Sequence, residues 1–145
     1  MREKAIYTLD RKAGLYLKKT ATKGYGVFCV TDIEQDEQLE VTPAILLDPA
    51  ATAHIDKTIL ENYKFTAGPM TKRQRKILGI YDPDKSSCMI MGIMTYCNHD
   101  EHPNADIFWE EHAGTAYHVL EAIRPIPKHT EICTSYGEGW FEERK

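Results

Sequence analysis

A dense group of polar residues follows the most apolar part of the central sequence. The segment Asn98-His99-Asp100-Glu101-His102-Pro103-Asn104 comes directly after residues 88–96, which have the pattern of a buried strand. Polar side chains at the end of such a strand can face a ligand and hydrogen bond to it, so Asn98 and His99 are candidate ligand-binding residues. The nearby Cys97, His99 and His102 leave a small metal-binding β-protein open as an alternative, although their spacing matches no usual zinc site.

A second group of candidates lies close to the C-terminus. Tyr136 follows an expected short strand at 131–134 and precedes Gly137. Its phenol could face a reacting group, or its ring could pack half-buried on the strand. Trp140 and Phe141 come next, and they could either form a wall against an aromatic ligand such as adenine or anchor the end of the chain.

Two glycines separated by one residue, Gly24 and Gly26, allow a backbone to approach a ligand closely, because neither carries a side chain. The pair lacks the third glycine and the following helix of a phosphate-binding fingerprint. Both an ordinary β-turn and a site for a non-phosphate cofactor are therefore compatible with it.

The elements that must position these residues are mostly short strands separated by turns. Apolar runs predict strands at 15–18, 27–30, 38–41, 44–46, 106–111, 116–122 and 131–134. Residues 112–114 have the length and composition of a hairpin turn. Helices are expected only at 55–63 and 71–78. Two similar corners contain Asp36 and His129, each at a turn position that favours positive φ.

Length and hydropathy limit the functional classes. With 145 residues and 42% hydrophobic content, the chain is expected to form one domain spanning residues 1–145. It has no apolar stretch of membrane-spanning length and no secretory signal, so we expect an intracellular protein, cytoplasmic or nuclear, with no membrane partner. The four cysteines form no C-x-x-C pair, so no structural metal is expected. The histidines outside the candidate loop, His118 among them, are expected at the surface or in turns.

The charge distribution favours a basic protein partner. A formal net charge of −4 argues against direct nucleic-acid binding, which requires a basic face. Five acids near the candidate site follow one another without an intervening Lys or Arg: Asp100, Glu101, Asp106, Glu110 and Glu111. Such a run either attracts a basic peptide or is simply a solvated edge.

Three of these segments, in this order, resemble the signature segments of the SET domain. They are Gly24-Tyr25-Gly26-Val27-Phe28, the segment from Asn98 to Asn104, and Glu131-Ile132-Cys133-Thr134-Ser135-Tyr136-Gly137. SET domains are protein-lysine methyltransferases that use S-adenosylmethionine. The resemblance, which extends from near Lys12 to Phe141, implies a mainly β fold with short helices: the SET-domain β-clip fold with a C-terminal pseudoknot.

The resemblance also implies roles by position. Tyr136 would be the catalytic tyrosine. Tyr63 and Thr134 would line a channel through which a substrate lysine reaches the methyl group from the face opposite the cofactor. The residues that would contact S-adenosylmethionine are Gly24, Tyr25, Gly26, Asn98, His99, Trp140 and Phe141. A homodimer is a further expectation, because a compact SET protein would have no flanking domain to cover its sheets.

Three positions depart from the pattern of the family. Glu101 stands where many members have Cys, and Thr134 and Ser135 replace a frequent Phe and Asp. The Phe position often helps to limit how many methyl groups are added, so the product state stays open. The sequence also lacks the cysteine-rich segments that bind zinc clusters in larger relatives. A catalytically silent SET-like module that binds a peptide or the cofactor is therefore a second interpretation.

Overall fold

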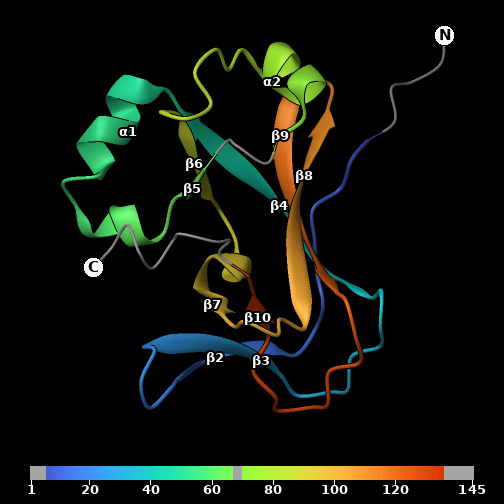
Figure 1. Cartoon of the computed structure of the whole chain (residues 1–145). Helices are drawn as coiled ribbons and strands as arrows, with labels where there is room; N and C mark the ends of the chain where they lie inside the picture. Colours follow the sequence, from blue (N-terminus) through green and yellow to red (C-terminus); the bar gives the residue numbers. More distant parts are fainter. Residues whose placement is uncertain (1–5, 67–69, 136–145) are drawn as a thin grey trace, which may run out of the picture.

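Within residues 6–66 and 70–135, which the computed structural model describes, a curved sheet of six strands forms the larger part of the structure (Figure 1). Five of its strands have the order β5-β6-β4-β9-β8, and β1 pairs with β4. All these pairs are antiparallel. The strand bounds are β1 Asp10–Arg11, β4 Gln38–Leu47, β5 Phe65–Thr66, β6 Ser87–Ile90, β8 Ala105–His112 and β9 Thr115–Ala122.

Two smaller sheets in the described residues lie at one end of the large sheet, at the bottom of Figure 1. In the first, β2 (Leu15–Lys19) pairs antiparallel with β3 (Tyr25–Cys29). In the second, β7 (Asn98–His99) pairs parallel with β10 (Cys133–Thr134). An isolated bridge between Val27 of β3 and Ile132 joins the two small sheets.

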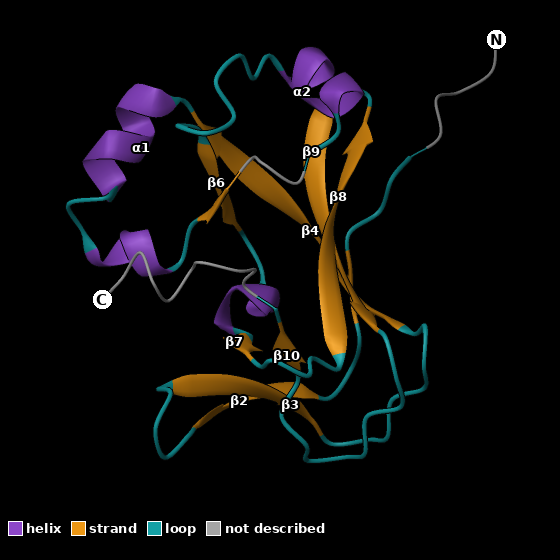
Figure 2. Cartoon of the chain, in the orientation of Figure 1, coloured by secondary structure: helices purple, strands orange, loops and turns teal. Residues whose placement is uncertain are grey.

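Short helices complete the structure (Figure 2). The α-helices are α1 (Pro49–Ile55) and α2 (Lys72–Leu78), both at the end of the large sheet farthest from the small sheets. Two 3-10 helices are η1 (Ile59–Asn62) and η2 (Ile93–Tyr96), and η2 leads directly into β7. The predicted mainly β fold with short helices is confirmed.

The first predicted helix was misplaced. The range 55–63 contains only the last residue of α1 and the 3-10 helix η1, whereas α1 begins at Pro49. Asp48 caps this helix by accepting a hydrogen bond from the backbone N of Ala51 at 2.8 Å. Proline suits the first helical position because its missing N–H has no partner there in any case. The sequence therefore contained a helix start signal, Asp48-Pro49. The residues after it are rich in alanine and lack an amphipathic pattern, which is why the helix was not predicted there.

The predicted strands 38–41 and 44–46 form one strand, β4, which continues through Pro43. Residues 38–43 pair with β9, and residues 44–47 pair with β6. Pro43 thus lies where the neighbours of β4 change. A residue that cannot donate to the ladder is tolerated at such a position.

The turn predictions at the two similar corners are confirmed. Asp36 and His129 have φ angles of 67° and 62°. The corners also contact each other, because Ile33 and Ile126 exchange two backbone hydrogen bonds of 2.8 and 2.9 Å. The sequence similarity between the corners therefore reflects two matching turns that pack together across the fold.

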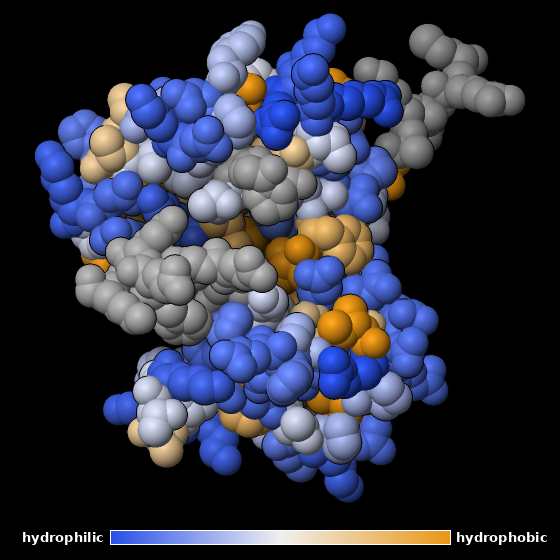
Figure 3. Space-filling view, viewed as in Figure 1, coloured by the Kyte–Doolittle hydropathy of each residue, from blue (hydrophilic) through white to orange (hydrophobic). Residues whose placement is uncertain are grey.

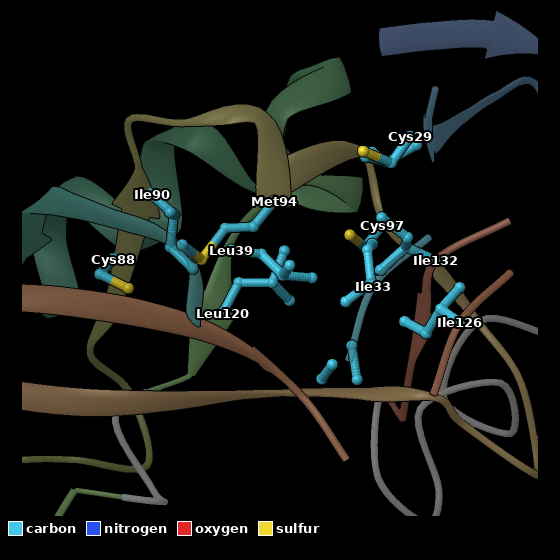
Figure 4. Packing of buried hydrophobic residues seen from close by; sticks show 13 residues of the cluster. Cys29, Ile33, Leu39, Cys88, Ile90, Met94, Cys97, Leu120, Ile126 and Ile132 are labelled. Carbon is cyan, nitrogen blue, oxygen red and sulfur yellow. The ribbon is translucent and has the colours of Figure 1, made fainter. Parts of the chain in front are cut away.

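The core lies between the large sheet and the small sheets, where Leu39, Met94 and Leu120 are almost fully buried (Figure 4).

His118 was expected at the surface, and this prediction was wrong: the residue is 1% exposed on β9, with its ring centroid 3.9 Å from that of Trp109. Burial lowers the pKa of His118 to about 3. The imidazole is therefore neutral at physiological pH and packs as an aromatic core residue.

A buried carboxylate connects the N-terminal part of the sheet to η2. Glu40, on β4, is 1% exposed and accepts hydrogen bonds from the backbone N of Ile93 at 3.0 Å and of Met94 at 2.9 Å. The Arg11 guanidinium donates to the same carboxylate at 2.9 Å. Gly92 is required beside it, because a Cβ there would lie 2.7 Å from both carboxylate oxygens.

We expect Glu40→Ala to destabilise the protein strongly. The substitution leaves two backbone N–H groups without an acceptor and Arg11 without its partner, which costs about 3 kcal/mol of unfolding free energy. Urea unfolding followed by circular dichroism measures the loss. Glu34→Ala removes an exposed carboxylate and serves as the control, with an expected change below about 0.5 kcal/mol. Equal stability of the two variants would show that Glu40 does not hold η2.

Candidate functional site

The parallel pairing of β7 with β10 brings two of the three signature segments together. Asn98 lies opposite Cys133, and His99 lies opposite Thr134. The contact continues past the strands, where the backbone N of Asp100 donates to the carbonyl of Thr134 at 3.0 Å. Residues 35 positions apart in the chain thus form one small sheet at the end of the core (Figure 1).

Asn104 holds this pairing in place with its side chain. Its Nδ2 donates to the Glu131 carbonyl at 2.8 Å, and its Oδ1 accepts from the backbone N of Cys133 at 2.8 Å. The amide of Asn104 therefore satisfies backbone groups on either side of Ile132, in the manner of an extra peptide unit. The sequence analysis gave Asn104 no individual role, although this residue ends the polar segment that begins at Asn98.

The two glycines of the first signature segment have different structural reasons. Gly24 has a φ of 71°, in the left-handed region, and its carbonyl accepts hydrogen bonds from the backbone N and the hydroxyl of Thr20. At Gly26 a Cβ would lie 2.5 Å from Oε2 of Glu131. Gly24 therefore shapes the turn between β2 and β3, whereas Gly26 makes room for the Glu131 carboxylate.

A pocket of about 460 Å³ opens between the β2–β3 turn, η1 and the junction of η2 with β7. Five of the residues proposed from sequence line it: Gly24, Tyr25, Tyr63, Asn98 and His99. The other lining residues, which the sequence did not single out, are Thr22, Lys23, Asn62, Thr95 and Tyr96. Lys23 and Tyr96 are sequence neighbours of the two motifs, and this proximity was the only signal that could have identified them.

Among the proposed residues that the structure describes, Gly26 and Thr134 are not in the lining of this pocket. Thr134 is 3% exposed on β10 beside His99. Tyr136, Trp140 and Phe141 fall outside the described residues.

Asn98 has both hydrogens of its amide engaged within the protein. Its Nδ2 donates to the Tyr25 carbonyl at 3.0 Å and to Oε2 of Glu131 at 2.7 Å. A side-chain amide has two donor hydrogens and one acceptor oxygen. The group that Asn98 can offer to a ligand is therefore its oxygen, which accepts hydrogen bonds.

Two tyrosines in the pocket lining, Tyr63 and Tyr96, form an aromatic wall. The rings of Tyr63 and Tyr96 meet edge to face, with centroids 6.1 Å apart and planes at 62°. On the face shown in Figure 3, apolar side chains gather in a hollow between the large sheet and the small sheets. The pocket itself combines a polar end at Asn98 with the aromatic rings of Tyr25, Tyr63 and Tyr96.

Two cysteines near the candidate site, Cys97 and Cys133, are buried. Burial raises the pKa of the Cys97 thiol, and it raises that of Cys133 to about 11. Among the described residues, no group of three His, Cys, Asp or Glu side chains is arranged to hold a metal ion.

Comparisons with known proteins agree on one family. A sequence model of the SET domain matches residues 24–137. Among curated proteins, the chain is similar to the histone-lysine N-methyltransferase, H3 lysine-37 specific, of Schizosaccharomyces pombe. The two are 25% identical over 134 residues, which cover 91% of this chain and 80% of the relative.

Two solved structures share the fold. A candidate histone methyltransferase of Plasmodium falciparum superposes with a TM-score of 0.60 and 21% identity, over 90% of this chain and 98% of that chain. The Neurospora SET domain protein DIM-5, a histone lysine methyltransferase, has a TM-score of 0.66 and 20% identity. That match covers 88% of this chain but only 54% of the Neurospora chain. The fold class predicted from the sequence is confirmed.

We expect Asn104→Ala to weaken the pairing of β7 with β10. It leaves the backbone N of Cys133 without its acceptor, so we expect a loss of about 2 kcal/mol in urea unfolding. Asn62→Ala, an identical change at an exposed pocket residue, is the control and should cost less than about 0.5 kcal/mol. Similar midpoints for the two variants would contradict a holding role for Asn104.

Proposed function

The chain belongs to the SET-domain family, and we propose that it is a protein-lysine N-methyltransferase that transfers a methyl group from S-adenosylmethionine to the ε-amine of a protein lysine. The observation that carries the proposal is the pocket at the β7–β10 pairing. It collects the first and second signature segments around one cavity, with the start of the third packed behind Asn98. A silent SET-like module would share this pocket and is separated from an enzyme by turnover.

The pocket residues fit the proposed cofactor. A volume of about 460 Å³ is in the range of sites for small cofactors. Asn98 supplies a hydrogen-bond acceptor, Lys23 a cation, and Tyr25 an aromatic surface. We propose that Gly24, Tyr25, Gly26, Asn98 and His99 bind the cofactor and that Trp140 and Phe141 complete the site. When bound, S-adenosylmethionine supplies a methyl group on a sulfonium.

The protein must present the substrate amine without its proton. A lysine amine has a pKa of about 10.4, so deprotonation near neutral pH costs roughly 4 kcal/mol. A channel with aromatic walls favours the neutral amine because it removes water from the charged form. We propose that Tyr63, whose ring meets that of Tyr96 edge to face, borders this channel where it opens into the cofactor pocket. Holding the amine in line with the methyl group then accounts for much of the rate.

Tyr136 is the proposed catalytic residue, and the proposal rests on its position in the third signature segment of the sequence. Its hydroxyl would orient the methyl group and stabilise the charge that develops during transfer. Thr134, two residues earlier, is proposed to border the channel where many family members have Phe. Thr is smaller than Phe and would leave more room around a methylated amine. The number of methyl groups that the protein adds therefore has to be measured separately.

The proposed substrate is a protein segment rich in Lys. The similarity to a histone-lysine methyltransferase of Schizosaccharomyces pombe supports a histone-like tail as substrate and, with it, a nuclear or other intracellular location. The acidic run agrees in sign: Glu101 and Asp106 are exposed, and Asp100, Glu110 and Glu111 are partly exposed. No helix within residues 6–66 and 70–135 is long and apolar enough to cross a membrane. A homodimer is also proposed, on the expectation that the sheets need cover.

We expect Asn98→Ala to lower the affinity for S-adenosylmethionine by roughly tenfold or more, because a lost hydrogen bond to a charged group costs about 1.5–3 kcal/mol. Isothermal titration measures the affinity, and circular dichroism checks the fold. His102→Ala, an exposed change in the same loop, should bind normally. Unchanged affinity in a folded Asn98→Ala variant would contradict the cofactor assignment.

We expect Tyr136→Phe to lower turnover on a Lys-rich histone peptide by roughly a hundredfold while leaving cofactor affinity nearly unchanged. The change removes only the hydroxyl, which acts mainly in the transition state. Transfer of a labelled methyl group measures the rate, and Tyr81→Phe, at a 93% exposed ring, is the control. Near wild-type turnover would transfer the catalytic role to another tyrosine, with Tyr63 first. Binding without any turnover in the wild type would favour the silent module.

A further inference from the structure

Glu131 contacts two residues that line the pocket, although the sequence analysis proposed no role for it. Its Oε2 accepts from Asn98 at 2.7 Å, and its Oε1 lies 4.0 Å from Nζ of Lys23. Gly26 leaves the space that the carboxylate occupies. The Glu131 side chain is 20% exposed, and its backbone carbonyl is held by Asn104. This carboxylate is therefore firmly placed immediately behind two residues that line the pocket, Lys23 and Asn98.

The first consequence concerns the direction of the Asn98 amide. Its two acceptors, the Tyr25 carbonyl and the Glu131 carboxylate, both require the NH₂ group. A flipped amide would bring its oxygen against a carbonyl and a carboxylate, with no donor among the three. The carboxylate therefore fixes Asn98 with its oxygen as the group left over for a ligand, and its negative charge adds to the attraction for a cation.

The second consequence concerns Lys23. Its side chain is 42% exposed, and its ammonium is 4.0 Å from the carboxylate, so the two attract each other without a short hydrogen bond. A lysine ammonium has three donor hydrogens, which leaves capacity for an anion. Glu131 therefore holds a cation and an acceptor oxygen side by side at one end of the pocket. An α-amino acid group, with its carboxylate and its ammonium, is complementary to this pair.

We propose that Glu131 is a positioning residue that makes this end of the pocket specific for the α-amino acid part of the ligand. Asn98 accepts from the ammonium, Lys23 pairs with the carboxylate, and Glu131 sets the orientation of both without touching the ligand. The inference rests on the proposed function, because S-adenosylmethionine carries such a group at one end.

Two probes that differ only at that end test the inference. S-adenosylhomocysteine and methylthioadenosine share the adenosine and the thioether, and only the first has the α-amino acid group. Isothermal titration of both probes, directly or in competition, gives the ratio of their affinities. The variants are Glu131→Gln, which keeps the size and removes the charge, and Lys23→Gln at an exposed side chain that is not part of the core. Glu121→Gln, a partly buried carboxylate on β9, is the matched control.

We expect Glu131→Gln and Lys23→Gln each to reduce the preference for S-adenosylhomocysteine roughly tenfold, with little change for methylthioadenosine and none in the control. An equal loss for both probes would show that Glu131 only supports the fold and would overturn the inference. An unchanged ratio in both variants would overturn it as well. If the wild type binds neither S-adenosylmethionine nor these probes, the proposed function itself fails, and this inference with it.

Discussion

The carboxylate of Glu40 is the constraint on which the position of the candidate site depends. It is buried on β4 and receives the first backbone N–H groups of η2, so the start of that helix is fixed relative to the large sheet. Tyr96 ends η2, Cys97 is packed into the core, and Asn98 begins β7. A buried charge requires several partners to offset its desolvation, and Arg11 supplies the countercharge. The position of the pocket residues Tyr96 and Asn98 therefore depends on Glu40, which is more than fifty residues earlier in the chain.

The second signature segment is held from the other side by amide and carboxylate groups rather than by extensive packing. Asn104 binds the backbone around Ile132, and Glu131 binds Asn98. Each of these side chains uses its polar atoms on protein partners, which leaves few orientations open to it. A site that must place a ligand accurately benefits from residues whose own positions are fixed in this way.

Local features of the structure could be predicted from the sequence, and long-range contacts could not. The corners at Asp36 and His129 followed from turn preferences, and the β8–β9 hairpin followed from its Ala113-Gly114 turn. The resemblance grouped Asn98 and His99 with Gly24, and these three residues line one pocket. Their binding of a cofactor stays a prediction. Nothing local distinguished Glu40 or Glu131 from surface residues of the same type, because their partners lie tens of residues away. His118 packs against Trp109 of the same hairpin, but its other neighbours, Phe65 and Cys88, are distant in the sequence. Polar residues of this kind are normally exposed, so composition pointed in the wrong direction.

The parallel pairing of β7 with β10 has a consequence for the order in which the chain can fold. A nascent chain that ends before Cys133 has the Asn98–His99 strand but not its neighbour. Most strand pairs of the large sheet, such as β4 with β9, also join distant segments, and such topologies fold slowly because the intervening loops must close first. The ligand pocket is thus among the last parts to assemble during synthesis. A chain truncated before Ile132 would lack a fully buried core residue and leave its neighbours exposed, so premature termination would lead to aggregation rather than to a partly active protein.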